Sequence, residues 1–145
     1  MNFGTPIEQV TRKDMLPITI QLPGTMPATA ANYEVFFIAL RPYEIMEVSE
    51  VHRVKGTEVD ATTVNIERLS GTEALDAGDT VCVAGFNLLG TINTVVTKKT
   101  GDLQNRLLNT GDRLALKDVA TTALTSVAGL TITLLLKPLG RGDYR

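Results

Sequence analysis

One histidine, His52, and one cysteine, Cys82, are the residues of this chain best suited to nucleophilic chemistry. A Ser-His-Asp or Cys-His catalytic device would have to combine His52 with Cys82 or with one of only three serines. Cys82 stands in the apolar run TVCVAG, where nothing nearby would lower the pKa of its thiol, so we expect a buried structural cysteine. His52 follows Val51 in a stretch with strand character, and we expect it to face outward.

Metal binding has equally little support in the sequence. Structural zinc needs three or four His or Cys ligands, and the chain has two such residues. Asp76 with Asp79, or Glu58 with Asp60, could contact a hard cation, but neither pair lies in the spaced loop of an EF-hand. We therefore predict that the protein binds no metal.

The other chemical motifs are weak. Glu47 and Glu50 are a candidate carboxylate pair for glycosidase chemistry, but residues three apart on a strand face opposite sides. No glycine-rich segment has the spacing of a P-loop or a dinucleotide site. Arg141-Gly142-Asp143 is the integrin-binding tripeptide, which we interpret as a chance match. These patterns predict a protein that is not an enzyme and has no cofactor.

Composition narrows the class of partner. The chain has 145 residues, 43% hydrophobic and 21% charged, which is typical of one globular domain. Its net charge of −2 offers no broad positive surface, so we expect no nucleic-acid partner. No apolar stretch is long enough to span a bilayer, and the N-terminal residues lack the apolar core of a signal peptide. We expect a soluble protein with no membrane partner.

Residues 1–26 are predicted to form an extended N-terminal arm. Four prolines interrupt the first 31 residues, and prolines fix φ and remove hydrogen-bond donors. Within this arm only residues 18–22, ITIQL, have a strand pattern. The arm either lies along its own domain or reaches a neighbouring subunit.

Residues 27–145 are predicted to form an all-β sandwich of the jelly-roll type. Abundant threonine and irregularly spaced glycines favour short strands with turns between them. Residues 32–40, NYEVFFIAL, are apolar on both faces and predict a strand that is central or lies between its own core and another chain. Residues 43–54 predict a strand, either regular or bulged, although apolar spacing there also fits a helix.

Residue patterns also predict the remaining strands and turns of the sandwich. We expect a strand with Val64 and Ile66 facing inward, then a short helical turn capped by Thr72 and ended by Gly78. Residues 80–102 predict two or three short strands. The alternating leucines of residues 113–117 and 130–136 predict a final, hairpin-like pair of strands.

Three motifs carry a resemblance to a known class of protein: EVSEVHRVKGT, LSGTEALDAG and GDRLALKD followed by AGLTITLLLK. From Pro27 onward, about four-fifths of the chain, the sequence resembles the decoration, cement or head-fibre proteins of tailed-phage virions. The resemblance implies a sandwich that trimerises on the outer face of an icosahedral head. It implies the major capsid protein as partner, the capsid exterior as location, and synthesis in the bacterial cytoplasm.

Candidate contact residues follow from this interpretation. The two-faced strand and an outward-facing leucine indicate more apolar surface than one small sandwich can hide, and oligomerisation is the usual remedy. The alternative is that the arm covers this surface within one chain. We expect subunit contacts near the trimer axis at Val35, Phe37 and Leu135. Capsid or neighbour contacts are expected in the arm at Pro6, Ile7, Val10, Leu16, Ile18, Ile20 and Leu22.

Two other functions are less consistent with the sequence. A glycan- or host-surface-binding jelly-roll module of a head or tail fibre would need exposed aromatic side chains, and the chain has no tryptophan and three tyrosines. A small esterase or a cupin-like oxygenase is less consistent still, because a single histidine cannot form the usual multi-histidine cupin site.

Overall fold

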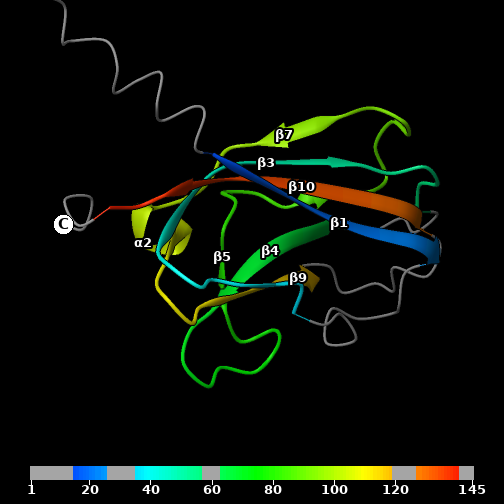
Figure 1. Ribbon diagram of the computed structural model, residues 1–145. Helices are drawn as coiled ribbons and strands as arrows, with labels where there is room; N and C mark the ends of the chain where they lie inside the picture. Colours follow the sequence, from blue (N-terminus) through cyan, green and yellow to red (C-terminus); the bar gives the residue numbers. More distant parts are fainter. Residues whose placement is uncertain (1–14, 26–34, 57–62, 119–126, 141–145) are drawn as a thin grey trace, which may run out of the picture.

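Two antiparallel β-sheets form a sandwich in this computed structural model, which describes residues 15–25, 35–56, 63–118 and 127–140 (Figure 1). Sheet A contains β1 (Leu16–Thr25), β10 (Ala128–Pro138), β3 (Tyr43–Val51) and β7 (Val96–Lys98) in that order, with β8 (Leu107–Leu108) also pairing β3. Sheet B contains β2 (Phe37–Ile38), β9 (Arg113–Asp118), β4 (Thr63–Leu69) and β5 (Asp79–Thr80) in that order, with β6 (Phe86–Asn87) also pairing β4. The predicted all-β, jelly-roll-like sandwich is confirmed.

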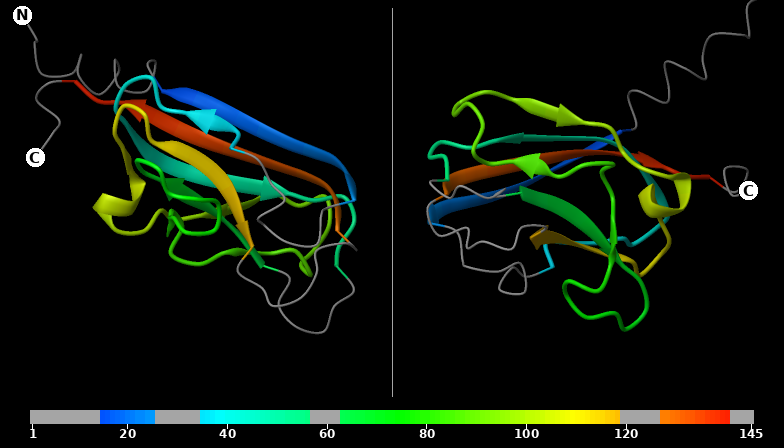
Figure 2. Two further views of the ribbon diagram at one scale, coloured as in Figure 1. Left: turned by 90° about the horizontal axis from the view of Figure 1, so that it is seen from below. Right: turned by 180° about the vertical axis from the view of Figure 1, so that it is seen from behind.

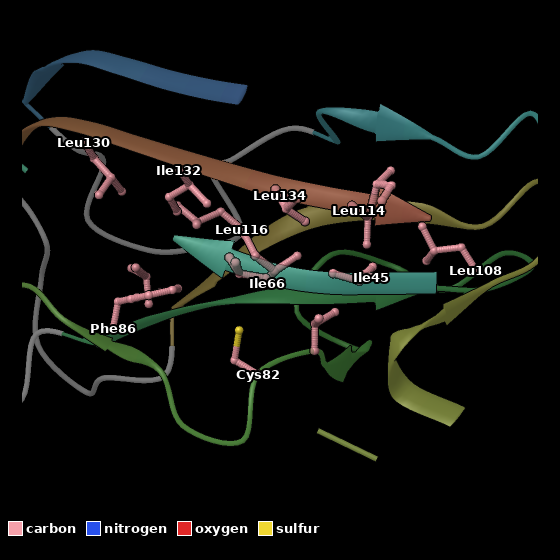
Figure 3. Close-up of a cluster of buried hydrophobic side chains, with 14 of the residues drawn as sticks. Ile45, Ile66, Cys82, Phe86, Leu108, Leu114, Leu116, Leu130, Ile132 and Leu134 are labelled. Carbon is pink, nitrogen blue, oxygen red and sulfur yellow. The ribbon is translucent and has the colours of Figure 1, made fainter. Parts of the chain in front are cut away.

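The hydrophobic core fills the space between the two sheets (Figure 3). On β10, every second residue from Leu130 to Leu136 is buried, as the alternation predicts. Ile66 on β4 and Leu116 on β9 face them from sheet B, and Phe86 closes the core beside β4. Full burial of one such side chain stabilises the fold by roughly 1.5–3 kcal/mol, so this core is the main source of stability.

β3 changes the parity of its inward-facing positions at a bulge. The register against β10 shifts at Met46, so the predicted strand is confirmed in its bulged form. Ile45 is buried before the shift, whereas Val48 and Glu50 are buried after it. A regular strand would have kept odd-numbered positions inward throughout. The bulge therefore also turns His52 toward the interior.

β1 is an edge strand of sheet A, so the strand expected at residues 18–22 is present and this part of the arm lies along its own domain, one of the two expected placements. It pairs with β10 from Leu16 opposite Leu136 to Thr25 opposite Ala128, and Figure 2 shows the two strands side by side. An edge strand tolerates proline because one row of its N–H groups has no sheet partner. The boundary expected at residue 26 thus falls after a strand that belongs to the sandwich, and residues 1–14 lie outside the described part.

The prediction of a central strand over residues 32–40 is wrong. Within the described part of this segment only β2 is a strand, and it lies at the edge of sheet B beside β9. Ile38 is 55% exposed and Leu40 is 85% exposed, so the apolar pattern on the second face reflects exposed side chains. The chain bends at residues 40–41 before Pro42, which ends the extended run.

The prediction of a final hairpin-like pair is also wrong. β9 pairs with β4 in sheet B, whereas β10 pairs with β1 and β3 in sheet A. Both strands exist, but only β10 buries alternate residues, since Leu114, Ala115 and Leu116 of β9 are all buried, and the chain crosses from one sheet to the other between the two strands. Alternation identifies a strand with one buried face and carries no information about its neighbour in the sheet.

The turn after β4 contains no helical turn. Instead of a cap from Thr72, the Glu73 carboxylate accepts hydrogen bonds from the backbone N–H of Ser70 at 2.6 Å and from its hydroxyl at 3.1 Å. The described helix α2 (Leu103–Arg106) has four residues, and none of the described helices is long and apolar enough to cross a membrane. The three short strands β5, β6 and β7 confirm the prediction for residues 80–102.

Candidate functional site

A buried acid–histidine pair lies at the end of β3. The Nδ1 atom of His52 is 3.1 Å from Oε2 of Glu50, and both side chains are 1% exposed. The Nε2 atom of His52 donates to the carbonyl oxygen of Gly90 at 3.4 Å. The expected outward orientation of His52 is wrong because the bulge at Met46 reverses the parity of the strand.

The pair is held by hydrogen bonds at both ring nitrogens of His52. The Gly90 carbonyl can only accept, so Nε2 is the donor in that contact, and Nδ1 faces the Glu50 carboxyl group. Burial raises the pKa of Glu50 above its usual 4.5, against the lowering effects of His52 and Lys98. Oε1 of Glu50 is buried and has no hydrogen-bond partner among the described residues. Glu47 points outward from the same strand, as predicted for residues three apart.

The candidate metal ligands do not form a site in the described residues. No group of three His, Cys, Asp or Glu side chains is placed to hold a metal ion there. Asp79 instead lies 3.4 Å from the Arg68 guanidinium, and Asp76 lies 3.9 Å from the Lys117 ammonium. Glu58, Asp60 and the Arg141–Asp143 tripeptide fall outside the described part of the chain.

Cys82 is a buried structural thiol, as the sequence predicts. Its burial raises the pKa of the thiol to about 11, so the reactive thiolate is scarce near neutrality. We expect iodoacetamide at mildly alkaline pH to leave Cys82 unmodified in the folded protein and to alkylate it in guanidinium chloride. Mass spectrometry of both samples measures this, and equal modification in the two would contradict the burial of the thiol.

Two buried polar side chains that the sequence analysis missed organise the segment after β4. Glu67 accepts hydrogen bonds from the backbone N–H of Asp76 at 2.8 Å and of Gly78 at 3.1 Å. Asn65 donates to the carbonyl of Cys82 at 3.0 Å and accepts from its N–H at 3.1 Å. Polar residues alternating with Val64 and Ile66 are typical of a solvent-exposed face, so only the later loop that covers them reveals their burial.

The predicted arm contacts divide into three groups. Ile18 and Ile20 are half-buried and pack against the core of their own chain. Leu16 is exposed at the start of β1. The structure does not describe the side chains of the other four predicted contacts, which are Pro6, Ile7, Val10 and Leu22.

The three predicted subunit-interface residues are not brought together. Phe37 lies in sheet B, packs against the core and meets the Tyr43 ring edge-on at a centroid distance of 5.9 Å. Val35 is half-buried just before β2. Leu135 lies on the outer face of sheet A, between the buried positions of β10. Only Leu135 therefore lies on a broad sheet surface facing away from the core.

That outer face of sheet A carries a row of hydroxyl groups. Thr19, Thr133, Ser49 and Thr97 are partners in register across β1, β10, β3 and β7. The Thr19 and Thr133 hydroxyl oxygens are 3.1 Å apart, and those of Ser49 and Thr97 are 2.8 Å apart. These side chains are short and uncharged, whereas Glu47, the partner of Leu135 across β3, adds an exposed carboxylate to the same face.

A hollow of about 670 Å³ opens at the end of the sandwich where β3 stops. We call it the Arg53 hollow; its lining residues are Arg53, Val54, Lys55, Leu89, Gly90, Thr91 and Ile92. Val54 and Ile92 are exposed apolar residues, and neither cationic side chain is in an ion pair with any described residue. The lining contains no aromatic ring of the kind that sugar sites use.

No protein-family model matches the sequence, and no curated protein sequence matches it either. Among solved structures, a chain in the capsid of Ralstonia phage GP4 is similar, with a TM-score of 0.61, 9% identity, and coverage of 88% of this chain and 86% of that one. A chain of the cyanophage Pam1 capsid asymmetric unit has a TM-score of 0.45 and 15% identity, covering 86% of this chain and 84% of that one. The protein therefore shares its fold with a chain found in a phage capsid.

Proposed function

We propose that this protein is a structural component of a tailed-phage virion. In this role it is a decoration protein that binds the outer surface of the icosahedral head as a homotrimer and stabilises it. The observation that carries the proposal is the likeness of fold, over nearly all of both chains, to a chain of a phage capsid. The resemblance of three sequence motifs to virion decoration proteins supports the same assignment.

Stabilisation by such a protein needs no catalytic chemistry. A ligand that binds only the assembled shell lowers its free energy by RT ln(1 + [L]/Kd), and about 100-fold excess over Kd contributes roughly 2.7 kcal/mol for each site. Three linked subunits also raise the effective concentration of the second and third contacts. The major capsid protein is the partner, contacted at the start of β1 by exposed Leu16 and the residues before it.

Rebinding to undecorated heads tests this function. Heads of the phage that encodes the protein, grown with its gene deleted, are mixed with the purified chain and sedimented. We expect saturable cosedimentation and a higher temperature of DNA release. Replacement of exposed Lys99 is the matched control. Lys99 directly follows β7, at the opposite edge of sheet A from Leu16, so this variant should bind normally. Heads that neither bind the protein nor gain stability would overturn the proposal.

The homotrimer has its own test. Light scattering of the full chain should give a mass near three times 15.7 kDa. Deletion of residues 1–14, which ends before β1, should leave the trimer intact if the contact lies in the sandwich. Loss of the trimer on this deletion would place the contact in the N-terminal residues, and a monomer in both cases would contradict a preformed trimer.

A further inference from the structure

We propose that neighbouring copies of this chain join head to tail, with the acidic turn of one copy seated in the Arg53 hollow of the next. The acidic turn is the segment of residues 70–79 that follows β4. The inference rests on the proposed homotrimer and names the surfaces that form it.

The acidic turn has the chemistry of a ligand for a cationic, apolar hollow. Glu73, Asp76 and Asp79 are exposed; Asp76 and Asp79 lie 3.9 Å from Lys117 and 3.4 Å from Arg68 of the same chain, yet their side chains remain 56% and 61% exposed. Between them stand exposed Ala74 and half-buried Leu75, which supply aliphatic surface. Figure 1 shows the turn projecting away from β4 and β9.

The turn is held in a fixed shape by contacts behind it. The buried Glu67 carboxylate accepts two of its backbone N–H groups. Lys117 donates to the carbonyls of Asp76 at 3.1 Å and Gly78 at 2.9 Å, and Arg113 donates to the carbonyl of Glu73 at 2.8 Å. A segment ordered before binding loses little conformational entropy when a partner contacts it.

The hollow presents a restrained arginine side chain to an acidic partner. Gly129 has a φ of +68°, and a Cβ built there would lie 2.8 Å from Cβ of Arg53 and 3.0 Å from its Nε. The Arg53 side chain therefore lies directly over the Gly129 backbone, which limits its conformations. Lys55 adds a second cation, and Val54 and Ile92 provide apolar surface between and beside the charges. Carboxylates next to aliphatic groups complement this lining in both charge and polarity.

The two surfaces cannot meet within one chain. The acidic turn lies against sheet B, where Arg113 and Lys117 of β9 contact it, whereas the residues that line the hollow follow β3 in sheet A or precede β7. Figure 1 shows the loop after β4 beyond β4 and β9, on the side away from β3. Two complementary patches at different places on one molecule form a heterologous contact, which closes into a ring when the rotation between copies allows it.

Charge reversal on each side tests the contact. The hollow variant is Arg53→Glu with Lys55→Glu. The turn variant is Ala74→Lys with Ala77→Lys, which adds cations at exposed positions and leaves every carboxylate and its internal hydrogen bonds in place. We expect each variant alone to weaken the trimer by at least about tenfold in dissociation constant, measured by light scattering at low salt. A chain that carries all four substitutions should regain the trimer, because the two signs are exchanged together.

The control is Lys99→Glu with Lys137→Glu, which makes the same change in net charge away from the hollow and should leave the trimer unchanged. Circular dichroism melts establish that each variant is folded. A trimer that resists both reversals overturns this contact and leaves the homotrimer standing. A wild-type monomer overturns the homotrimer itself. A third outcome is a wild-type mass that keeps growing with concentration and is lower in both variants. The contact would then join copies into an open chain, a result that supports the contact and contradicts the closed trimer.

Discussion

Deletion of residues 1–25 is expected to abolish folding of this protein, whereas deletion of residues 1–14 is expected to leave it intact. The longer deletion removes β1, and with it the ladder to β10 and the packing of Ile18 and Ile20 against the core. We expect a loss of about 5 kcal/mol or more from apolar burial and hydrogen bonds together, which is comparable with the whole stability of a small domain.

The longer deletion would also expose the backbone edge of β10. β10 would become a long, apolar edge strand with unpaired backbone groups, which is a template for aggregation. Circular dichroism and size-exclusion chromatography of the two deletions measure the outcome. A soluble, cooperatively folded protein lacking residues 1–25 would mean that β1 is dispensable to the sandwich.

Substitution of His52 by Ala is expected to cost roughly 3–5 kcal/mol of unfolding free energy at neutral pH. The change leaves the Glu50 carboxylate buried without its hydrogen-bonding partner, beside an Oε1 atom that already has none. Adding Glu50→Gln to the His52→Ala chain should recover a large part of this loss, because the buried charge is gone. Denaturant titrations of the four proteins in this cycle measure the coupling. If His52→Ala costs the same with and without the Glu50→Gln change, the two side chains do not interact.

The same variants predict a dependence on pH. Burial raises the pKa of Glu50 in the folded state above 4.5, so the folded protein keeps this proton to a higher pH than the unfolded chain does. The contribution of Glu50 to stability is therefore complete below pH 4.5 and is lost as the pH rises through the folded pKa. The unfolding free energy of His52→Ala, minus that of His52→Ala with Glu50→Gln, should fall over this range. A difference that stays level or rises with pH would contradict the raised pKa.

The sequence predicts the elements of this fold better than it predicts their arrangement. Alternation identified β10 because one buried face imposes a period of two. It also predicted the inward Val64 and Ile66, although Asn65 and Glu67 on the other face of β4 are buried too. It could not identify the sheet to which a strand belongs, so β9 and β10 were wrongly paired. The sequence predicted a strand at residues 18–22 but left open whether this segment lies along its own domain or a neighbour, since prolines suit an edge strand as well as they suit an extended segment.

The candidate site was harder to predict than the core. The orientation of His52 depends on a single extra residue in β3, and a bulge reverses every side chain that follows it. The burial of Glu67 depends on a turn that folds back over β4 from residues 76–78. The Arg53 hollow joins two segments more than thirty positions apart, and no local pattern records that proximity.

A cryo-electron microscopy reconstruction of heads from the phage that encodes this chain tests the central claim most directly. The account predicts density on the outer face of the shell that fits three copies of the two-sheet sandwich around a common axis, with the start of β1 directed toward the major capsid protein. Heads whose outer surface carries no such density, in particles shown by mass spectrometry to lack the protein, would contradict it.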